Sequence, residues 1–414
     1  MLDTEKQDDQ VTTIELVPSS ERAHAASRWQ DLERRIANTG LTNSWCWIET
    51  WLKLFGNVQH IFAFGTKDTQ PIGAALITKS VYIYKVGSIS IPSVFLGTAG
   101  EPREERTYVE YNRLLVAPEN LDAFAAGLIN TLKQFPWEQL RLHGFVPEHA
   151  DALIKAGSNI GLKFKVEKRP SPTFDFPKGA DEGYRDTISA LGSSSTRRSI
   201  RQSIRILGIH TVEWAETPEQ AKDILKDLID LHSKRWESIG ESGAFRADRV
   251  RKYHEDLIDA LFPKGSLIVF RVKQGAKQDE ERTIGCLFNF VENGHVMNYK
   301  SGFALFSDDN RLKPGLVTHV LCMEECRQRG LIEYDFLEGD ERYKMQLSNT
   351  EKNTLIWASA QRSRRAWAVE LARDLYHDPR FKRVENLIKG VKFQEIPQRT
   401  LVFARTWLRQ KTKI

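Results

Sequence analysis

The sequence contains little cysteine and no long apolar run. Its four cysteines in 414 residues are too few for a disulfide framework, so we expect a reducing compartment and a cytoplasmic protein. No stretch approaches the roughly 18 apolar residues that a membrane-spanning helix requires. The first ten residues are polar and charged, and they lack the basic and apolar regions of a secretory signal. We therefore expect neither a disulfide-rich secreted protein nor an integral membrane protein.

The sequence also lacks the pattern of a metal centre. Cys322 and Cys326 are four residues apart on a predicted helix, but no second cysteine pair and no histidine cluster accompanies them. A structural zinc site needs about four such ligands. We interpret the two cysteines as packing residues and expect no metal.

Apolar residues and charge, by contrast, are plentiful. The apolar fraction of 41% and ten tryptophans can fill two hydrophobic cores, so two domains of about 200 residues each are expected. Residues 361–414 hold fourteen Lys and Arg against five Asp and Glu, whereas the net charge of the whole chain is only +5. A basic tail on a mildly acidic body indicates an anionic partner, either a membrane surface or a phosphate-rich ligand.

The predicted elements follow the same order in both halves of the chain. Each half begins with a strand and two helices and continues with strands, a helix and a last strand. Pro170, Pro172 and Pro177 mark a predicted linker between the halves. Asn293-Gly294 predicts a type I′ turn between two strands. The predicted strands are 12–17, 60–65, 72–80, 81–91, 139–144, 161–168, 210–214, 266–272, 283–291, 295–302 and 332–337, and the helices are 21–37, 45–55, 121–135, 148–156, 195–207, 218–236, 246–261 and 315–328.

The tail is predicted to form two helices, 362–376 and 381–391. The second has an apolar stripe with basic residues beside it. Two interpretations stand: helices that pack on the body with a solvated basic face, or a peripheral contact with an anionic membrane surface.

Four segments together resemble a known family. They are residues 194–201 (SSTRRSIR), 231–236 (LHSKRW), 311–315 (RLKPG) and 335–344 (DFLEGDERYK). Their order and spacing are similar to those of the CelD-like (cellulose biosynthesis protein type) acetyltransferases, a branch of the GNAT superfamily related to the Fem-type peptidyltransferases. The resemblance covers roughly residues 173–360, and the first half resembles the family more loosely.

This resemblance implies an α/β fold with two tandem GNAT-like acyltransferase domains and a helical basic C-terminal tail. The corresponding domains are residues 10–170, 171–360 and 361–414. It further implies transfer of an acyl group from acyl-CoA, with an acetyl or a longer chain, to an amine, and a link to envelope polysaccharide or lipid assembly.

The run 334–344 carries the candidate catalytic groups. An alkylamine is only about 0.1% neutral at pH 7, so aminolysis of a thioester benefits from a general base. Glu338 or Asp340, in a turn at the carboxyl end of a strand, would orient and deprotonate the amine. Tyr343 would return a proton to the thiolate, and Lys344 would bind a phosphate or neutralise the carboxylates. Alternatively, the run is an ordinary charged surface turn.

Asp335 has two interpretations of equal weight. An unpaired carboxylate in a buried strand is costly, so Asp335 is either a working group or a structural lock paired with Lys344 or an arginine.

The donor site is expected at the start of the helix 315–328. Arg311, Lys313 and Gly315 precede or open this helix, whose first N–H groups suit a pyrophosphate. The usual GNAT loop is Gln/Arg-x-x-Gly-x-Gly/Ala, and here Pro314 and Leu316 replace the two small residues. Proline followed by glycine at a helix start is also ordinary capping chemistry.

Three arginines of the helix 195–207 extend this donor site. Arg197, Arg198 and Arg201 could hold the phosphates of CoA, of a nucleotide-linked acceptor or of lipid headgroups. A solvated helix face is the alternative interpretation.

The acceptor is expected beside the strand 295–302 and the end of the helix 218–236. His232, Arg235 and Trp236 would line the acceptor cleft with Tyr299, and the thioester would lie in the splay next to Tyr299's strand, polarised by backbone N–H groups. His232 and Arg235 at a helix end are also favourable through the helix dipole alone.

These observations predict an acyl-CoA-dependent N-acyltransferase in the cytoplasm, or peripheral at the inner face of the membrane. Its acceptor would be a small-molecule or lipid-linked amine, and no DNA partner is expected. Two alternatives stay open. One is a Fem-type transferase that uses aminoacyl-tRNA, and the other is a non-catalytic assembly factor for exopolysaccharide synthesis.

Overall fold

The structure is a computed structural model that describes residues 12–37, 39–83, 89–178, 184–241, 243–275, 281–306 and 311–377. The chain divides into two compact units. The larger comprises Met1–Tyr82 and Pro92–Arg362, and the smaller comprises Ile83–Ile91 and Ser363–Ile414. Within the smaller unit, the helix α11 (Arg364–His377) is described, and the Nη2 of its Arg365 donates to the carbonyl of Ser90 at 2.8 Å. The predicted helix 381–391 lies outside the described residues.

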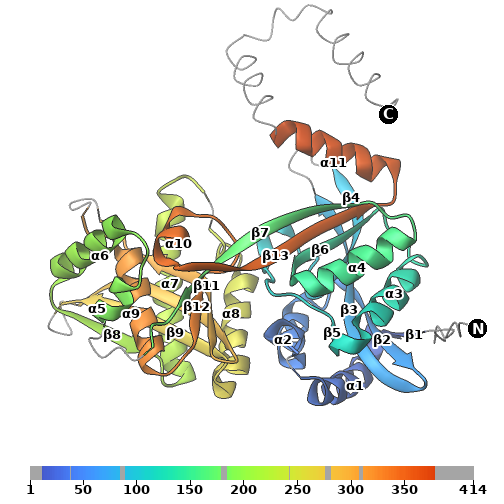
Figure 1. Ribbon diagram of the computed structural model, residues 1–414, viewed down its shortest axis with the longest axis horizontal. Coiled ribbons are helices and arrows are strands. Elements are labelled where there is room, and N and C mark those ends of the chain that lie inside the picture. The colour runs from blue at the N-terminus through green and yellow to red at the C-terminus, as the bar shows by residue number, and fades with distance from the viewer. Residues whose placement is uncertain are drawn as a thin grey trace, which may run out of the picture. The chain divides into compact units, whose positions relative to one another are not determined.

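The first half of the larger unit follows the predicted order closely (Figure 1). Ser44 begins α2 as its N-cap, since its hydroxyl accepts the N–H of Trp47 at 3.2 Å. Of the predicted strand 81–91, the first three residues belong to the end of β3 and the last two to the start of β4, and residues 84–88 lie outside the described residues. The elements are β1 (Thr13–Pro18), α1 (Arg22–Arg35), α2 (Trp45–Phe55), β2 (Gln59–Lys67), β3 (Gln70–Ile83), β4 (Ser90–Leu96), β5 (Leu115–Val116), α3 (Leu121–Leu132), β6 (Gln139–Phe145), α4 (Pro147–Asn159) and β7 (Phe164–Asp175).

The second half repeats this order after two additional helices. Asn293 and Gly294 have φ angles of 51° and 81°, which confirms the predicted type I′ turn. The elements are α5 (Tyr184–Ser189), α6 (Ser194–Leu207), β8 (His210–Trp214), α7 (Pro218–Glu237), α8 (Asp248–Leu261), β9 (Leu267–Gln274), β10 (Arg282–Glu292), β11 (His295–Phe303), α9 (Pro314–Gln328), β12 (Glu333–Asp335), α10 (Arg342–Leu347) and β13 (Thr350–Gln361).

One continuous sheet joins the two halves. Its strand order is β1-β2-β3-β4-β6-β13-β7-β12-β11-β10-β9-β8, with β5 paired to β3. Most neighbours are antiparallel, but β4 with β6 and β11 with β12 are parallel pairs. The long strands β7 and β13 lie side by side and run from one half into the other (Figure 1). The predicted boundary at residue 170 therefore falls inside β7, and β13 completes the sheet of the first half through β6.

Two of the three prolines of the predicted linker are placed wrongly, because Pro170 and Pro172 lie within β7, whereas Pro177 follows the end of this strand. Their carbonyls accept the N–H groups of Gly339 at 3.1 Å and Phe336 at 3.0 Å, which follow the end of β12. The N–H and C=O of one residue point to the same side of a strand. The N–H groups that proline lacks would thus face a region where the β12 ladder has already ended.

Three hydrophobic clusters hold these elements together. One lies between the sheet of the first half and α3 and α4, and another lies between the sheet of the second half and α6 and α9. The third is shared by the halves, since it contains residues of α1, α2, α7 and α8. Within it the ring of Trp47 meets Tyr253 at 6.3 Å and Phe290 at 5.2 Å, both edge to face. Such contacts fix the two halves against each other.

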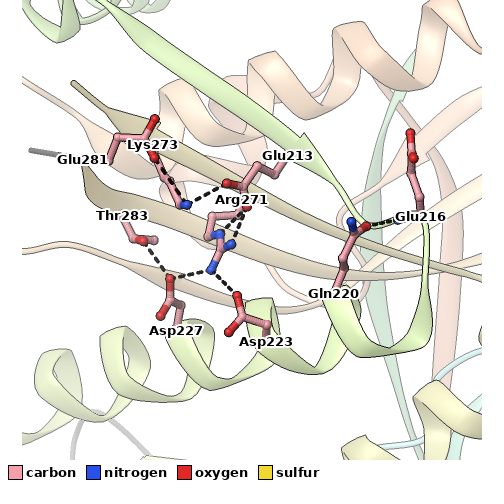
Figure 2. Close-up of polar contacts among 9 residues, drawn as sticks. All are labelled: Glu213, Glu216, Gln220, Asp223, Asp227, Arg271, Lys273, Glu281 and Thr283. Carbon is pink, nitrogen blue, oxygen red and sulfur yellow. Dashed lines mark hydrogen bonds and ion pairs between the residues drawn. The ribbon is translucent and has the colours of Figure 1, made fainter. Parts of the chain in front are cut away.

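An ionic network ties α7 to the sheet of the second half (Figure 2). The buried Arg271 of β9 lies 2.9 Å from both Asp223 and Asp227 of α7, and it also pairs with Glu213 of β8. Thr283 donates to the same Asp227 carboxylate at 2.7 Å. Because each carboxylate has a cationic or hydroxyl partner, this network explains how a charged arginine is tolerated in the sheet.

Candidate functional site

The strands β11 and β12 part early. They are paired only from His295 with Glu333 to Met297 with Asp335. On its other side, β11 contains a bulge: Phe288 of β10 lies opposite Lys300 and the next residue lies opposite Asn298, which leaves Tyr299 as the extra residue. A bulge re-aims the backbone and side chain where it occurs. The irregularity thus sits two residues past the last β11–β12 pair.

A small cavity of about 20 Å³, room for about one water molecule, opens at this place. Its walls come from both halves of the larger unit, and they are mainly aromatic and apolar with two carboxylates. That composition is typical of a small-molecule site with a few polar groups that fix orientation. The lining residues are Leu41, Thr42, Trp47, Tyr108, Glu110, Tyr111, Phe290, Glu292, Met297, Tyr299 and Leu337.

Asp335, at the end of β12, is buried and accepts hydrogen bonds from four segments of the chain. Its donors are the Ser171 hydroxyl at 2.7 Å, the Leu337 N–H at 2.6 Å, the Asn353 amide at 3.1 Å and the Tyr111 hydroxyl. Burial raises the pKa of Asp335, and the hydrogen bonds oppose this rise.

The predicted partner of Asp335 is wrong. Among the described residues no cation pairs with Asp335, and Lys344 instead donates to the carbonyls of Leu337, at 3.3 Å, and Glu338. Lys344 also lies 3.2 Å from Glu341. Asp335 therefore holds these segments together through hydrogen bonds from neutral donors and not through a salt bridge.

The other predicted catalytic groups are spread around the turn after β12. Glu338 forms an ion pair with Arg169, and Asp340 is exposed. The ring of Tyr343 stacks on His319 at 5.6 Å, and burial raises the pKa of its hydroxyl. None of Glu338, Asp340 and Tyr343 is among the pocket-lining residues.

A carboxylate that sequence reasoning missed lies in the pocket. Glu110 accepts the backbone N–H of Glu338 at 2.6 Å, which holds its side chain over the end of β12. Burial raises the pKa of Glu110 to about 8, and the charge of Glu338 adds to the rise. In the sequence, Glu110 is recognisable only as an acid between Val109 and Tyr111, in a segment without helical or strand periodicity. The structure buries Val109 fully and Tyr111 partly.

Tyr299 is the predicted acceptor residue that the structure brings to the pocket. Its ring stacks on His254 at 5.7 Å, and its hydroxyl has no hydrogen-bond partner among the described residues. The neighbouring Lys300 places its ammonium 5.5 Å from the Tyr108 ring centre. Burial lowers the pKa of Lys300 to about 8, although the charge of Glu110 opposes this change.

The structure does not bring His232, Arg235 and Trp236 into this pocket. They lie at the end of α7, where Arg235 and Trp236 are exposed. The Nε2 of His232 accepts the N–H of Ala244 at 3.2 Å. Burial lowers the pKa of His232 to about 4, so its imidazole is neutral at pH 7. In the structure this histidine fixes the loop after α7.

The predicted donor residues gather at the start of α9. The hydroxyl of Ser203 on α6 donates to the Arg311 carbonyl at 2.8 Å and accepts the Lys313 N–H at 3.2 Å. A Cβ added to Gly315 would lie 3.2 Å from the Phe303 ring, so a small residue is required for close packing. The loop before α9 is thus tied to α6.

The arginines of α6 have different environments. Arg197 donates to the carbonyls of Leu191 and, at 3.1 Å, Gly192, so it supports the loop before its own helix. Arg198 and Arg201 are exposed, and Arg201 reaches Ser189 at 3.5 Å. The exposed pair is compatible with either a phosphate contact or a solvated face.

A comparison with family models matches the second half of the chain. Residues 194–345 match the family described as "Acetyltransferase (GNAT) domain", and this stretch includes β11, β12 and the bulge at Tyr299. The fold is a tandem pair of GNAT-like domains. The first half shares the element order and the parallel strand pair of the second.

Several solved structures are similar to this chain at low sequence identity. The crystal structure of FemX is 12% identical, with 80% of this chain and 95% of that chain covered and a TM-score of 0.51. The C-terminal domain of a putative lysylphosphatidylglycerol synthetase from Agrobacterium fabrum is 12% identical, with 86% and 97% covered and a TM-score of 0.49. A tandem GNAT protein from the clavulanic acid biosynthesis pathway is 10% identical, with 84% and 98% covered and a TM-score of 0.43. No curated protein matches the sequence.

Two further findings concern the described part of the chain. No group of three or more His, Cys, Asp or Glu side chains there is arranged to hold a metal ion. No helix there is long and apolar enough to cross a bilayer. All four cysteines are free thiols, and Cys322 and Cys326 are buried, as expected of packing residues.

Proposed function

We propose that this chain is an N-acyltransferase of the CelD-like branch, which transfers an acyl group from acyl-CoA to an amine in envelope polysaccharide or lipid assembly. One observation carries the proposal. The bulge at Tyr299 lies where β11 and β12 part, inside the stretch that matches the GNAT domain, and a pocket opens beside it.

The chemistry of acyl transfer fits this arrangement. A thioester in the gap between the parting strands would meet the irregular backbone of β11, where the extra residue of the bulge stands outside the ladder. N–H groups fixed at such a place polarise a carbonyl and stabilise the oxyanion of a tetrahedral intermediate. The pocket would receive the amine of the acceptor, directed toward the thioester.

The start of α9 is the proposed site of the CoA phosphates. Arg311 and Lys313 would contribute charge there, and a helix N-terminus favours an anion. Pro314 and Leu316 depart from the usual GNAT loop, so the phosphate contact would rely on these side chains more than on a glycine-rich backbone.

The donor assignment is tested with purified full-length protein. We expect a rise in melting temperature with acetyl-CoA or with a medium- or long-chain acyl-CoA, and release of free CoA when primary amines are added. Arg311→Ala combined with Lys313→Ala should weaken the thermal shift, whereas the matched pair Lys222→Ala and Lys226→Ala on α7 should not. No thermal shift with any acyl-CoA would overturn the donor.

A second donor class is an aminoacyl-tRNA. The fold likeness to FemX favours including it in the test, although it shows the fold alone. Aminoacyl-tRNA added in place of acyl-CoA would then be deacylated in an amine-dependent reaction. A chain that neither binds acyl-CoA nor deacylates aminoacyl-tRNA would act instead as a non-catalytic assembly factor.

We also propose that the basic C-terminal part contacts the inner face of the membrane. In α11 the side chains of Trp367 and Leu371 are exposed and one helical turn apart, and Arg364 lies on the adjacent turn. Such a face suits an anionic interface. The full chain should sediment with vesicles that contain phosphatidylglycerol and not with neutral phosphatidylcholine vesicles. Equal recovery with both, or with neither, would contradict the proposal.

A further inference from the structure

The segment 108–112 of the first half reaches into the site of the second. Tyr108, Glu110 and Tyr111 line the pocket, and Tyr111 donates to Asp335 at the end of β12. This segment lies more than 200 residues from β12 in sequence, and it belongs to no helix or strand. Its contacts with the second half are therefore made by the tertiary fold and not by local secondary structure.

We propose that Glu110, supplied by the first half, is the general base that deprotonates the acceptor amine in the second half. The inference rests on the proposed acyl transfer and adds a catalytic residue to it. Three observations support it: Glu110 lines the pocket, the N–H of Glu338 fixes its carboxylate at the end of β12, and its charge acts on both Tyr299 and Lys300 beside the bulge.

The other carboxylates near the site differ from Glu110 in their partners or positions. Asp335 accepts four hydrogen bonds, Glu338 is paired with Arg169, and Asp340 is exposed. Glu292 also lines the pocket, but it accepts the Leu41 N–H at 3.1 Å, and it stands opposite His295 at the far end of the β11 hairpin from Tyr299. Glu110 is thus the pocket-lining carboxylate whose charge acts on Tyr299, the extra residue of the bulge.

The proton balance of the reaction gives this base a definite task. The acceptor enters as R–NH₃⁺ and gives one proton to the Glu110 carboxylate. The neutral nitrogen then attacks the thioester, so that a C–N bond forms and the C–S bond breaks. A second proton of the nitrogen passes to the departing CoA thiolate, and the proton on Glu110 is released to water. A base with a pKa near the working pH is efficient in the first step.

The electrostatic surroundings agree with this task. Burial raises the pKa of Glu110 to about 8 and lowers the pKa of Lys300 to about 8, so both groups change charge in the same narrow range. The described titratable groups that interact with Glu110 are Asp335, Glu338, Tyr343 and Lys344 at and after the end of β12, and Tyr299 and Lys300 on β11. As the pH rises through 8, the carboxylate form of Glu110 that can accept a proton becomes the main one.

The test compares full-length protein with its Glu110→Gln variant. The glutamine keeps an oxygen that can accept the Glu338 N–H but cannot take up a proton. Release of CoA from acetyl-CoA is followed from pH 6 to 10 with n-octylamine and 2-phenylethylamine as probe amines. We expect kcat/KM of the unchanged protein to rise through a pKa near 8. The variant should lose this inflection and about a hundredfold in rate at pH 8.

A weakly basic nucleophile provides the decisive second measurement. Hydroxylamine is already neutral at neutral pH, so Glu110→Gln should acylate it at nearly the unchanged rate. The unchanged protein should show no inflection near pH 8 with hydroxylamine, a result that needs no variant. If the inflection persists with hydroxylamine, or if Glu110→Gln slows both nucleophiles equally, Glu110 is not the base.

The matched control is Glu101→Gln. Glu101 is another buried carboxylate of the first half, and it accepts the Thr107 N–H at 2.6 Å, but it does not line the pocket. Its variant should keep the inflection near pH 8. Lys300 is the second candidate for the general base, and Lys300→Met tests it. Loss of the inflection in Lys300→Met but not in Glu110→Gln would assign the base to Lys300. Failure of the unchanged protein to bind or consume acyl-CoA would overturn the proposed function, whereas consumption that is insensitive to Glu110→Gln would overturn only the base.

Discussion

Each half of the larger unit contains a parallel pair of strands that part after three residues, and the two pairs differ in what lies beside the gap. β4 pairs with β6 from Ser93 to Phe95, and β11 pairs with β12 from His295 to Met297, in both cases over three residues. Two residues past the last pair stands Gly97 in the first half and Tyr299 in the second. The halves thus share a parting pair of strands but differ in what lies between them.

In the first half the chain itself fills the gap. The side chain of Asn112 donates to the carbonyls of Leu96 at 2.9 Å and His143 at 3.4 Å, and its backbone N–H donates to Gly144 at 2.8 Å. Gly97 has a φ of +94°, and a Cβ there would lie 2.8 Å from the Asn112 amide. A glycine is therefore required for the close approach of Asn112. Asn112 thus bridges the two strands where they part.

In the second half the corresponding place adjoins the pocket. Tyr299 and Met297 of β11 line it, and Leu337 closes it after β12. The same segment that seals the first gap with Asn112 contributes Tyr108, Glu110 and Tyr111 to the second. The first half thus serves as a wall and a source of side chains for the site of the second.

The largest effect on this comparison is expected from Asp335→Ala. The change leaves the Ser171 hydroxyl, the Leu337 N–H and two further donors without their acceptor in a buried site. We expect the free energy of unfolding to fall by about 4 kcal/mol. Urea unfolding followed by tryptophan fluorescence measures it. Asp340→Ala removes an exposed carboxylate from the same turn and should change stability by less than about 0.5 kcal/mol.

Equal losses for both variants would mean that Asp335 does not lock the two halves together. The same Asp340→Ala protein tests the predicted catalytic turn. Full activity in a normally folded variant would remove Asp340 from the working groups.

The next effect concerns pH and Glu110. Because the folded pKa of about 8 lies above the ordinary value of 4.5, the folded state keeps a proton that the unfolded state has lost. Glu110 therefore lowers stability as the pH rises from about 4.5 to 8. Relative to the unchanged protein, Glu110→Gln should gain about 4 kcal/mol in free energy of unfolding between pH 5 and pH 8.5. Urea titrations at the two pH values check this, and a constant difference would show that Glu110 titrates normally.

A smaller loss is expected from Asn112→Ala, which reopens the sealed gap. Two buried carbonyls, those of Leu96 and His143, lose their side-chain donor. We expect a loss of about 2 kcal/mol, measured by urea unfolding. Asn159→Ala, at the exposed end of α4, is the matched control and should be nearly neutral. A neutral Asn112→Ala would mean that the first gap does not depend on this plug.

Periodicity and turn chemistry predicted most of the helices and strands and the tandem arrangement. They did so because apolar spacing within α2 or α7 is a local property. The pocket is different: the contact of Tyr111 with Asp335 joins residues 224 positions apart, and no local pattern encodes it. Glu110 was missed for this reason. Pro170 and Pro172 led to the wrong prediction of a linker. Both can lie within β7 because β12 has already ended beside them on one side of the strand.

The smallest effect on stability is expected from Tyr299→Phe. The same variant is the most direct test of the site where β11 and β12 part. The Tyr299 hydroxyl is buried without a hydrogen-bond partner among the described residues, so its removal should change the free energy of unfolding by less than about 0.5 kcal/mol. Burial raises the pKa of this hydroxyl, as does the charge of Glu110, so it would act only as a proton donor. Loss of CoA release at unchanged stability would place the hydroxyl at the departing thiolate, whereas full activity would leave the bulged backbone as the sole contribution of this residue. Tyr253→Phe, which removes another unpartnered buried hydroxyl outside the pocket, is the control for both measurements.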